Sequence, residues 1–148
     1  MALIHTSTYE PVIAFKSKHF NTIYRTLFHK IDVGFQRERM ETSDGDFMDI
    51  DFSKVGSKNV VIVIHGLEGS STSKYVTAMS QISNEEGFDA AAVNLRGCSG
   101  ETNRLMSSYH SGKTNDLAEI IDYLETKKTY ENIYIVGYSL GGNLLLKY

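Results

Sequence analysis

The sequence predicts an α/β fold: a doubly wound, mostly parallel sheet that follows an N-terminal antiparallel hairpin. The main observation is that strand-like runs made mostly of apolar residues recur at 59–64, 88–95 and 132–136, as is typical of strands buried on both faces. The second is that segments with helical periodicity separate these runs, and such alternation implies right-handed crossovers. In sheets of this kind, ligands bind beyond the carboxyl ends of the strands.

Length and composition indicate one globular domain. The 148 residues fit a prior of roughly 100–200 residues per domain, with 1–30 as a lead-in and 31–148 as the sheet core. A content of 41% hydrophobic and 22% charged residues excludes a disordered tail. The 15 basic residues do not outnumber the 18 acidic ones, so we expect no nucleic-acid partner.

The sequence carries no visible membrane or export signal. No apolar run approaches the ~20 residues that cross a bilayer, and residues 1–6 lack the basic start and apolar stretch of a signal peptide. The single cysteine, Cys98, excludes an internal disulfide and fits a reducing compartment. We therefore expect a cytoplasmic protein without a transmembrane segment, and peripheral contact with a membrane stays open.

The remaining elements follow from turn and cap signals. Strand-like stretches at 32–41 and 46–53 flank an Asp-Gly turn, which predicts the hairpin, whereas 15–30 is either a short helix or irregular. Serines at 71 and 73 and Thr114 offer helix N-caps, Gly87 ends the first helix, and a last helix begins after Ser139. The apolar residues at helical spacing are Tyr75, Val76, Met79 and Ile82 in the first helix, and Leu117, Ile120, Ile121 and Leu124 in the second.

The turn at Ser139 carries the strongest functional signal. Residues 137–141 match G-x-S-x-G between a strand-like and a helix-like segment, which is the setting of a nucleophile elbow. We predict Ser139 as a nucleophile, with the Leu140 N–H at the helix start facing a developing oxyanion. The alternative is a glycine-rich turn with an inert serine. The glycines that would give this tight turn its room are Gly137, Gly141 and Gly142.

The loop after the first buried strand reads His65-Gly66-Leu67. In an enzyme with a nucleophile elbow, this position supplies the second N–H of the oxyanion hole. Gly66 lets the backbone turn toward the site, so we predict the Leu67 N–H as that donor. We expect His65 to support the loop rather than act as base, because the base follows the nucleophile in this order of elements.

The loop after residue 95 holds several polar residues with structural interpretations. We expect Arg96 to pair with a carboxylate or hold the loop, and Cys98 to pack as a small residue. His110 is expected to pack within its loop. Asp116 falls in the first turn of a helix, where it complements the helix dipole, and we do not predict it as a triad acid.

Together these motifs resemble the YheT-like, ABHD1-2-3-type branch of the α/β-hydrolases. The resemblance implies the N-terminal portion of an α/β-hydrolase domain with an incomplete sheet, and a serine hydrolase of short-chain carboxylic esters or acylglycerols. It implies a small-molecule or lipid-like ester substrate and neither a metal nor an organic cofactor. The matching segments are 19–24 (HFNTIY), 65–70 (HGLEGS), 94–100 (NLRGCSG), 109–112 (YHSG) and 137–143 (GYSLGGN).

The sequence departs from that family in length. The triad acid and histidine of the family follow the elbow, whereas this sequence ends at Tyr148, nine residues after Ser139. A serine needs a base to become a useful nucleophile, so the alternative is a non-catalytic remnant or binding fragment. A third hypothesis uses His110 or His65 as substitute base. We also expect the last strand to present a bare edge and the chain to self-associate through it.

Overall fold

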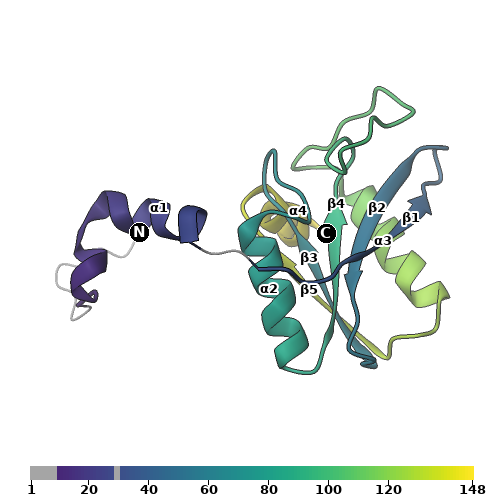
Figure 1. Cartoon of the computed structure of the whole chain (residues 1–148). Helices are drawn as coiled ribbons and strands as arrows, with labels where there is room; N and C mark the ends of the chain where they lie inside the picture. Colours follow the sequence, from purple (N-terminus) through teal and green to yellow (C-terminus); the bar gives the residue numbers. More distant parts are fainter. Residues whose placement is uncertain (1–9, 29–30) are drawn as a thin grey trace. The chain divides into compact units, whose positions relative to one another are not determined.

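The computed structural model describes residues 10–28 and 31–148, and the chain divides into two compact units, Met1–Lys30 and Ile31–Tyr148 (Figure 1). In the first unit, a short 3-10 helix at Ile13–Lys16 precedes α1 at Lys18–Phe28. The stretch that the sequence left open is therefore helical over these residues. Residues 1–9 and 29–30 of the predicted lead-in lie outside the described residues.

The second unit is a five-stranded sheet in the order β1-β2-β4-β3-β5. The pairs β1·β2 and β2·β4 are antiparallel, and β3 pairs in parallel with both β4 and β5. This confirms the predicted hairpin and parallel core. The strands are β1 (Gln36–Glu41), β2 (Phe47–Ser53), β3 (Asn59–Ile64), β4 (Asp89–Asn94) and β5 (Asn132–Gly137).

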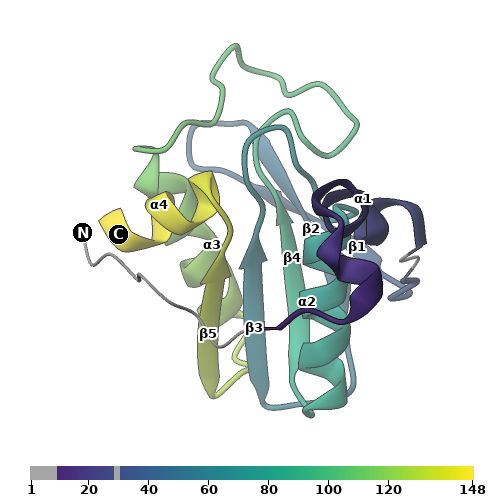
Figure 2. The ribbon, with the colours of Figure 1, turned by 90° about the vertical axis from the view of Figure 1, so that its left-hand side faces the viewer.

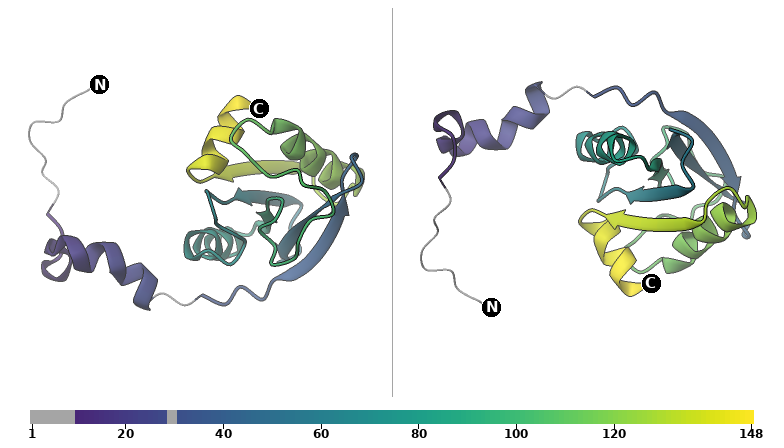
Figure 3. Two further views of the ribbon diagram at one scale, coloured as in Figure 1. Left: turned by 90° about the horizontal axis from the view of Figure 1, so that it is seen from above. Right: turned by 90° about the horizontal axis from the view of Figure 1, so that it is seen from below.

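Helices cover both faces of this sheet, as the doubly wound pattern predicts. Helix α2 (Lys74–Glu85) lies on one face, and α3 (Thr114–Thr126) and α4 (Leu140–Lys147) lie on the other (Figure 3). The loops after β3 and β4 rise from the same end of the sheet, at which α4 follows β5 (Figure 2). Within the described residues, no helix is long and apolar enough to span a membrane.

Strand β3 shows why its residues 60–64 are all apolar. Val60, Ile62 and Ile64 enter the core beneath α3 and α4. Val61 and Val63 enter the smaller core beneath α2. Side chains alternate across a strand, so a strand with helices on both faces needs apolar residues at both phases.

Two carboxylates are buried on β2 because arginines on β1 stand directly opposite them. Arg37 pairs with Asp51 across the strands and Arg39 with Asp49, each through two N–H groups at 2.7–3.0 Å. The paired charges satisfy the carboxylates, so β2 stays buried along its length. The hairpin strands begin later than the sequence predicted, at 36 and 47.

The structure corrects two details of the prediction. β5 is not a buried strand: none of its residues is fully buried and the Tyr134 side chain is 50% exposed, because β3 is its sole strand partner among the described residues. Thr114 is the first residue of α3 rather than its cap, and the N-cap position holds Lys113 without a side-chain hydrogen bond. Ser73 does occupy the N-cap of α2, but its hydroxyl accepts the N–H of Ser70 instead of a helical one.

Candidate active site

Ser139 lies in the turn between β5 and α4 in a backbone conformation that is rare for a side chain. Its φ is 52° and its ψ is −112°, and its side chain is exposed. Only two other described residues besides glycine, Glu68 and Lys128, have positive φ. Such a conformation costs about 1–3 kcal/mol and persists only where the surrounding structure imposes it.

Close backbone-to-backbone contacts at three glycines impose this turn. A Cβ atom added at Gly141 would lie 2.6 Å from the carbonyl oxygens of both Ile64 and His65, at the end of β3. One added at Gly142 would lie 3.0 Å from the carbonyl oxygen of Gly137, and one at Gly137 would fall on the Gly141 carbonyl. The three glycines therefore let the start of α4 pack directly on the ends of β5 and β3.

The loop after β3 leaves one backbone donor of residues 66–70 unpaired. The Gly66 N–H donates to the Tyr75 hydroxyl at 3.0 Å, and the Glu68 N–H donates to the Tyr109 hydroxyl at 2.8 Å. The N–H groups of residues 69 and 70 bond within the loop. The Leu67 N–H has no acceptor among the described residues.

His65 fixes the orientation of that loop. Its Nδ1 lies 2.7 Å from the carbonyl oxygen of Gly66, and its Nε2 accepts the N–H of Leu95 at 3.2 Å. An imidazole that donates from Nδ1 and accepts at Nε2 is neutral. The ring is fully buried, and this burial lowers its pKa. His65 therefore has no free lone pair to offer Ser139, which argues against it as a substitute base.

The loop and the serine meet face to face. A Cβ at Gly66 would lie 3.2 Å from Ser139 Cβ and 3.3 Å from the Tyr138 carbonyl oxygen. An open hollow of about 340 Å³ lies over this contact, lined by Gly66, Leu67, Tyr75, Tyr138 and Ser139. The sequence placed residues 66, 67 and 139 in one site, and the structure brings them together.

The start of α4 offers a second unpaired donor. The Gly141 N–H bonds to the Tyr138 carbonyl at 2.9 Å, and the Asn143 N–H bonds to the Ser139 carbonyl at 3.0 Å. The Leu140 N–H, one residue after the serine, has no acceptor in the described part of the chain. Two backbone donors, at Leu67 and Leu140, thus remain free in the residues that border Ser139.

A general base does not stand at the serine in the described part of the chain. The Ser139 hydroxyl has no hydrogen-bond partner in residues 10–28 and 31–148. His110 accepts the Gly112 N–H at Nδ1 and is exposed, which fits the expected role within its loop. Those same residues contain no group of three or more histidine, cysteine or acidic side chains that could hold a metal ion.

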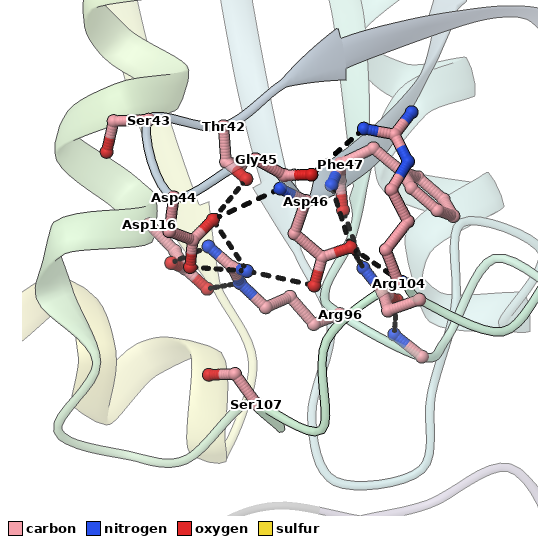
Figure 4. A network of polar contacts seen from close by, with 12 residues as sticks. Thr42, Ser43, Asp44, Gly45, Asp46, Phe47, Arg96, Arg104, Ser107 and Asp116 are labelled. Atoms are coloured by element: carbon pink, nitrogen blue, oxygen red, sulfur yellow. Dashed lines mark hydrogen bonds and ion pairs between the residues drawn. The ribbon is translucent and has the colours of Figure 1, made fainter.

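Arg96 anchors the loop after β4 through a buried ion cluster (Figure 4). Its guanidinium donates two hydrogen bonds to Asp116, at 2.9 and 3.0 Å, and also contacts Asp46 and Asp44. Burial opposes charge on Asp46, but hydrogen bonds from Asn103 and from backbone N–H groups, together with Arg96, lower its pKa to about 2. Sequence reasoning predicted a carboxylate partner for Arg96 but missed that Asp116 supplies it from inside the fold.

Two tyrosines at the site also escaped sequence reasoning. Tyr75 looked like a core position of its helix, and Tyr109 looked like part of a loop motif. Each uses its hydroxyl to accept a backbone N–H of the loop after β3. No local pattern carries this information, because both contacts join segments that meet only in the folded chain. Cys98 is half-buried as expected, and burial raises the pKa of its thiol.

Comparison with known proteins identifies the family of this chain. The model of the alpha/beta hydrolase fold family matches residues 59–148, and the chain belongs to that family. Within it, the chain is similar to YheT and to proteins named ABHD. It is 36% identical over 141 residues to YheT of Escherichia coli strain K12, which is named as an esterase. It is 28% identical over 153 residues to the human phospholipase ABHD3.

The chain spans less than half the length of these relatives. The match to YheT covers 91% of this chain and 41% of YheT, and the match to ABHD3 covers 97% and 37%. Solved structures agree on the fold. The Pyrococcus furiosus esterase Pf2001 superposes with a TM-score of 0.64 at 19% identity, over 74% of this chain and 44% of the esterase. Est1E from Butyrivibrio proteoclasticus gives 0.63 at 21% identity, over 74% and 46%.

Proposed function

We propose that the chain carries the nucleophile of a serine hydrolase of carboxylic esters, with Ser139 as that nucleophile. The observation that carries the proposal is the positive φ of Ser139 in a strand–turn–helix whose glycines pack backbone on backbone. A strained serine at the carboxyl end of a central parallel sheet is exposed to a substrate on the side where such sheets bind ligands. The family of esterases and lipases to which the chain belongs supports the same chemistry.

The two free backbone donors complete the proposed site. The Leu67 N–H and the Leu140 N–H would bind the oxygen of the tetrahedral intermediate, at which negative charge develops. The Gly66–Leu67 peptide is planar and trans, so its N–H points opposite to its carbonyl. Because His65 and the Gly69 N–H hold the Gly66 carbonyl, they also fix the direction of the Leu67 N–H.

The reaction has two steps. Ser139 Oγ attacks the ester carbonyl carbon while a base takes the hydroxyl proton, and the alcohol leaves with a proton as the acyl-enzyme forms. Water then attacks the acyl carbonyl, and the carboxylic acid leaves as Ser139 recovers its proton. No described histidine hydrogen-bonds to Ser139: both ring nitrogens of His65 are engaged elsewhere, and His110 accepts the Gly112 N–H within its own loop.

The substrate proposed for the complete site is a small or lipid-like ester. The open hollow beside Ser139 is lined by the aromatic rings of Tyr75 and Tyr138 and by the exposed side chain of Leu67, which suit an apolar acyl chain. Relatives named as phospholipase and monoacylglycerol lipase support a lipid-like ester. A cytoplasmic protein that contacts membranes at their surface fits such a substrate.

Covalent labelling with a fluorophosphonate tests the proposal. We expect the purified chain to be labelled at Ser139 and the Ser139→Ala variant to remain unlabelled, with the melting temperature of each measured in parallel. Labelling will be slow if the base is absent, because donors and binding alone retain only about 10³–10⁴-fold catalysis over water. A folded chain that does not label contradicts an activated serine here.

A second candidate function is a non-catalytic binding fragment. It is favoured by one observation, that the Ser139 hydroxyl has no described base beside it. In that case the chain would bind an ester or its acid product in the hollow without turning it over. Saturable binding of a short-chain ester, with neither labelling nor hydrolysis by the same folded sample, would identify this function.

A further inference from the structure

Tyr75 connects the two halves of the site. It is the second residue of α2, and its hydroxyl oxygen accepts the Gly66 N–H at 3.0 Å. Its ring packs against Tyr138, the residue before Ser139, with ring centroids 4.8 Å apart. One side chain therefore touches both the loop with the free Leu67 N–H and the turn with the serine.

The loop is shaped around this hydroxyl. A Cβ atom at Gly69 would lie 2.6 Å from the Tyr75 hydroxyl oxygen, closer than a Cβ atom approaches an atom to which it is not bonded. Gly69 has no positive φ that would itself require glycine. The Tyr75 hydroxyl, together with His65 Cβ at 3.0 Å and Nδ1 at 3.1 Å, thus occupies the space that a side chain at Gly69 would need.

Tyr75 also completes the restraint on Gly66. The Gly66 carbonyl is held by His65 and by the Gly69 N–H, and the Gly66 N–H is held by Tyr75. Glycine has the widest conformational freedom of any residue, so a glycine needs such restraint on both of its peptide groups to keep one orientation. The next N–H along the chain is the free donor of Leu67.

We propose that Tyr75 is a positioning residue for acyl transfer at Ser139: it holds Gly66 by its hydroxyl and braces Tyr138 by its ring, so that the Leu67 N–H faces the oxyanion. The inference rests on the proposed function. Tyr75 acts through Gly66 and not on the substrate carbonyl. Its loss should therefore slow the step that forms the tetrahedral intermediate and leave binding of the ground-state ester unchanged.

The Tyr75→Phe variant removes only the hydroxyl. We expect its second-order rate of fluorophosphonate labelling at Ser139 to fall about tenfold, the equivalent of one lost hydrogen bond. With a p-nitrophenyl ester of a short acid, kcat should fall by the same factor and KM should stay the same. The amide of Gly66, followed by ¹H–¹⁵N NMR, should exchange faster with solvent. The matched control is Tyr134→Phe, which removes a hydroxyl from a side chain of β5 that is 50% exposed, and it should leave all these values unchanged.

The outcomes separate this inference from the function on which it rests. A wild-type chain that labels at Ser139, together with Tyr75→Phe that labels equally fast, overturns the role of Tyr75 alone. A rise in KM with unchanged kcat for Tyr75→Phe also overturns it, since that change is the signature of a lost substrate contact. A folded wild-type chain that never labels overturns the proposed function, and the positioning role with it.

Discussion

The Nε2 atom of His65 accepts the backbone N–H of Leu95 at 3.2 Å, which joins the loop after β3 to the end of β4. The same ring holds the Gly66 carbonyl through Nδ1. The buried His65 ring thus hydrogen-bonds to two loops of the candidate site, and it can make both bonds only while it is neutral. That requirement makes its contribution to stability dependent on pH.

Burial lowers the pKa of His65 from its usual value near 6.5. Below about pH 6.5 the unfolded chain takes up a proton there that the folded chain does not, so the free energy of unfolding falls as pH decreases. Urea unfolding at pH 7.5 and 5.5 should show this loss. His65→Leu should be less stable at pH 7.5, by about 1–3 kcal/mol for the unpaired backbone groups, and should lose less on acidification. A wild-type chain equally stable at both pH values would refute the prediction.

The Leu67 prediction concerns the backbone and not the side chain. Leu67→Pro removes the N–H and should slow labelling of Ser139 by about 10²–10³-fold, the usual effect of losing one oxyanion donor. Leu67→Ala keeps the N–H and shortens a side chain that is 69% exposed. The rate of labelling of Ser139 should therefore fall much less in this variant. Equal rates for the two variants, at equal melting temperatures, would show that this N–H is not a donor.

Arg96 and Asp116 form the buried contact that holds the loop after β4. Asp116→Asn leaves part of the Arg96 charge unpaired in the interior and should destabilise the chain by about 3 kcal/mol in urea unfolding. Arg104→Gln breaks an ion pair with Glu41 on the surface and should leave the unfolding midpoint almost unchanged. A midpoint for Asp116→Asn that matches Arg104→Gln would contradict the structural role of the cluster.

The edge of β5, which no strand of the described residues covers, should make the chain associate with itself. Tyr134 is exposed on this strand, and an unpaired apolar edge is a template for another strand. Size-exclusion chromatography over a range of concentrations should show growing oligomers for the wild type and fewer for Tyr134→Lys, because a lysine on an edge opposes pairing. A monomer at every concentration, with a cooperative melt, would count against this expectation.

Much of the fold could be predicted because local chemistry determines it. The uninterrupted apolar residues at 60–64 and 90–93 signal strands with both faces covered, and β3 and β4 are buried in that way. The Asp-Gly turn predicted the hairpin. The same logic was wrong for β5, whose residues 133–136 are also apolar without interruption but which has a strand neighbour on one side only in the described part of the chain. Composition cannot tell a central strand from an edge strand.

The same distinction holds for the candidate site: some of its parts follow from local sequence, and others depend on the folded chain. The turn at Ser139 and the loop at Gly66 could be predicted from local sequence, because a tight turn needs glycine at particular neighbours of a residue. Three contacts could be seen only in the folded chain: Asp116 pairs with Arg96, His65 has both ring nitrogens engaged, and the hydroxyl of Tyr75 holds Gly66. These contacts join segments that are distant along the chain, and hydrogen bonds and ion pairs depend on distances that no local pattern contains.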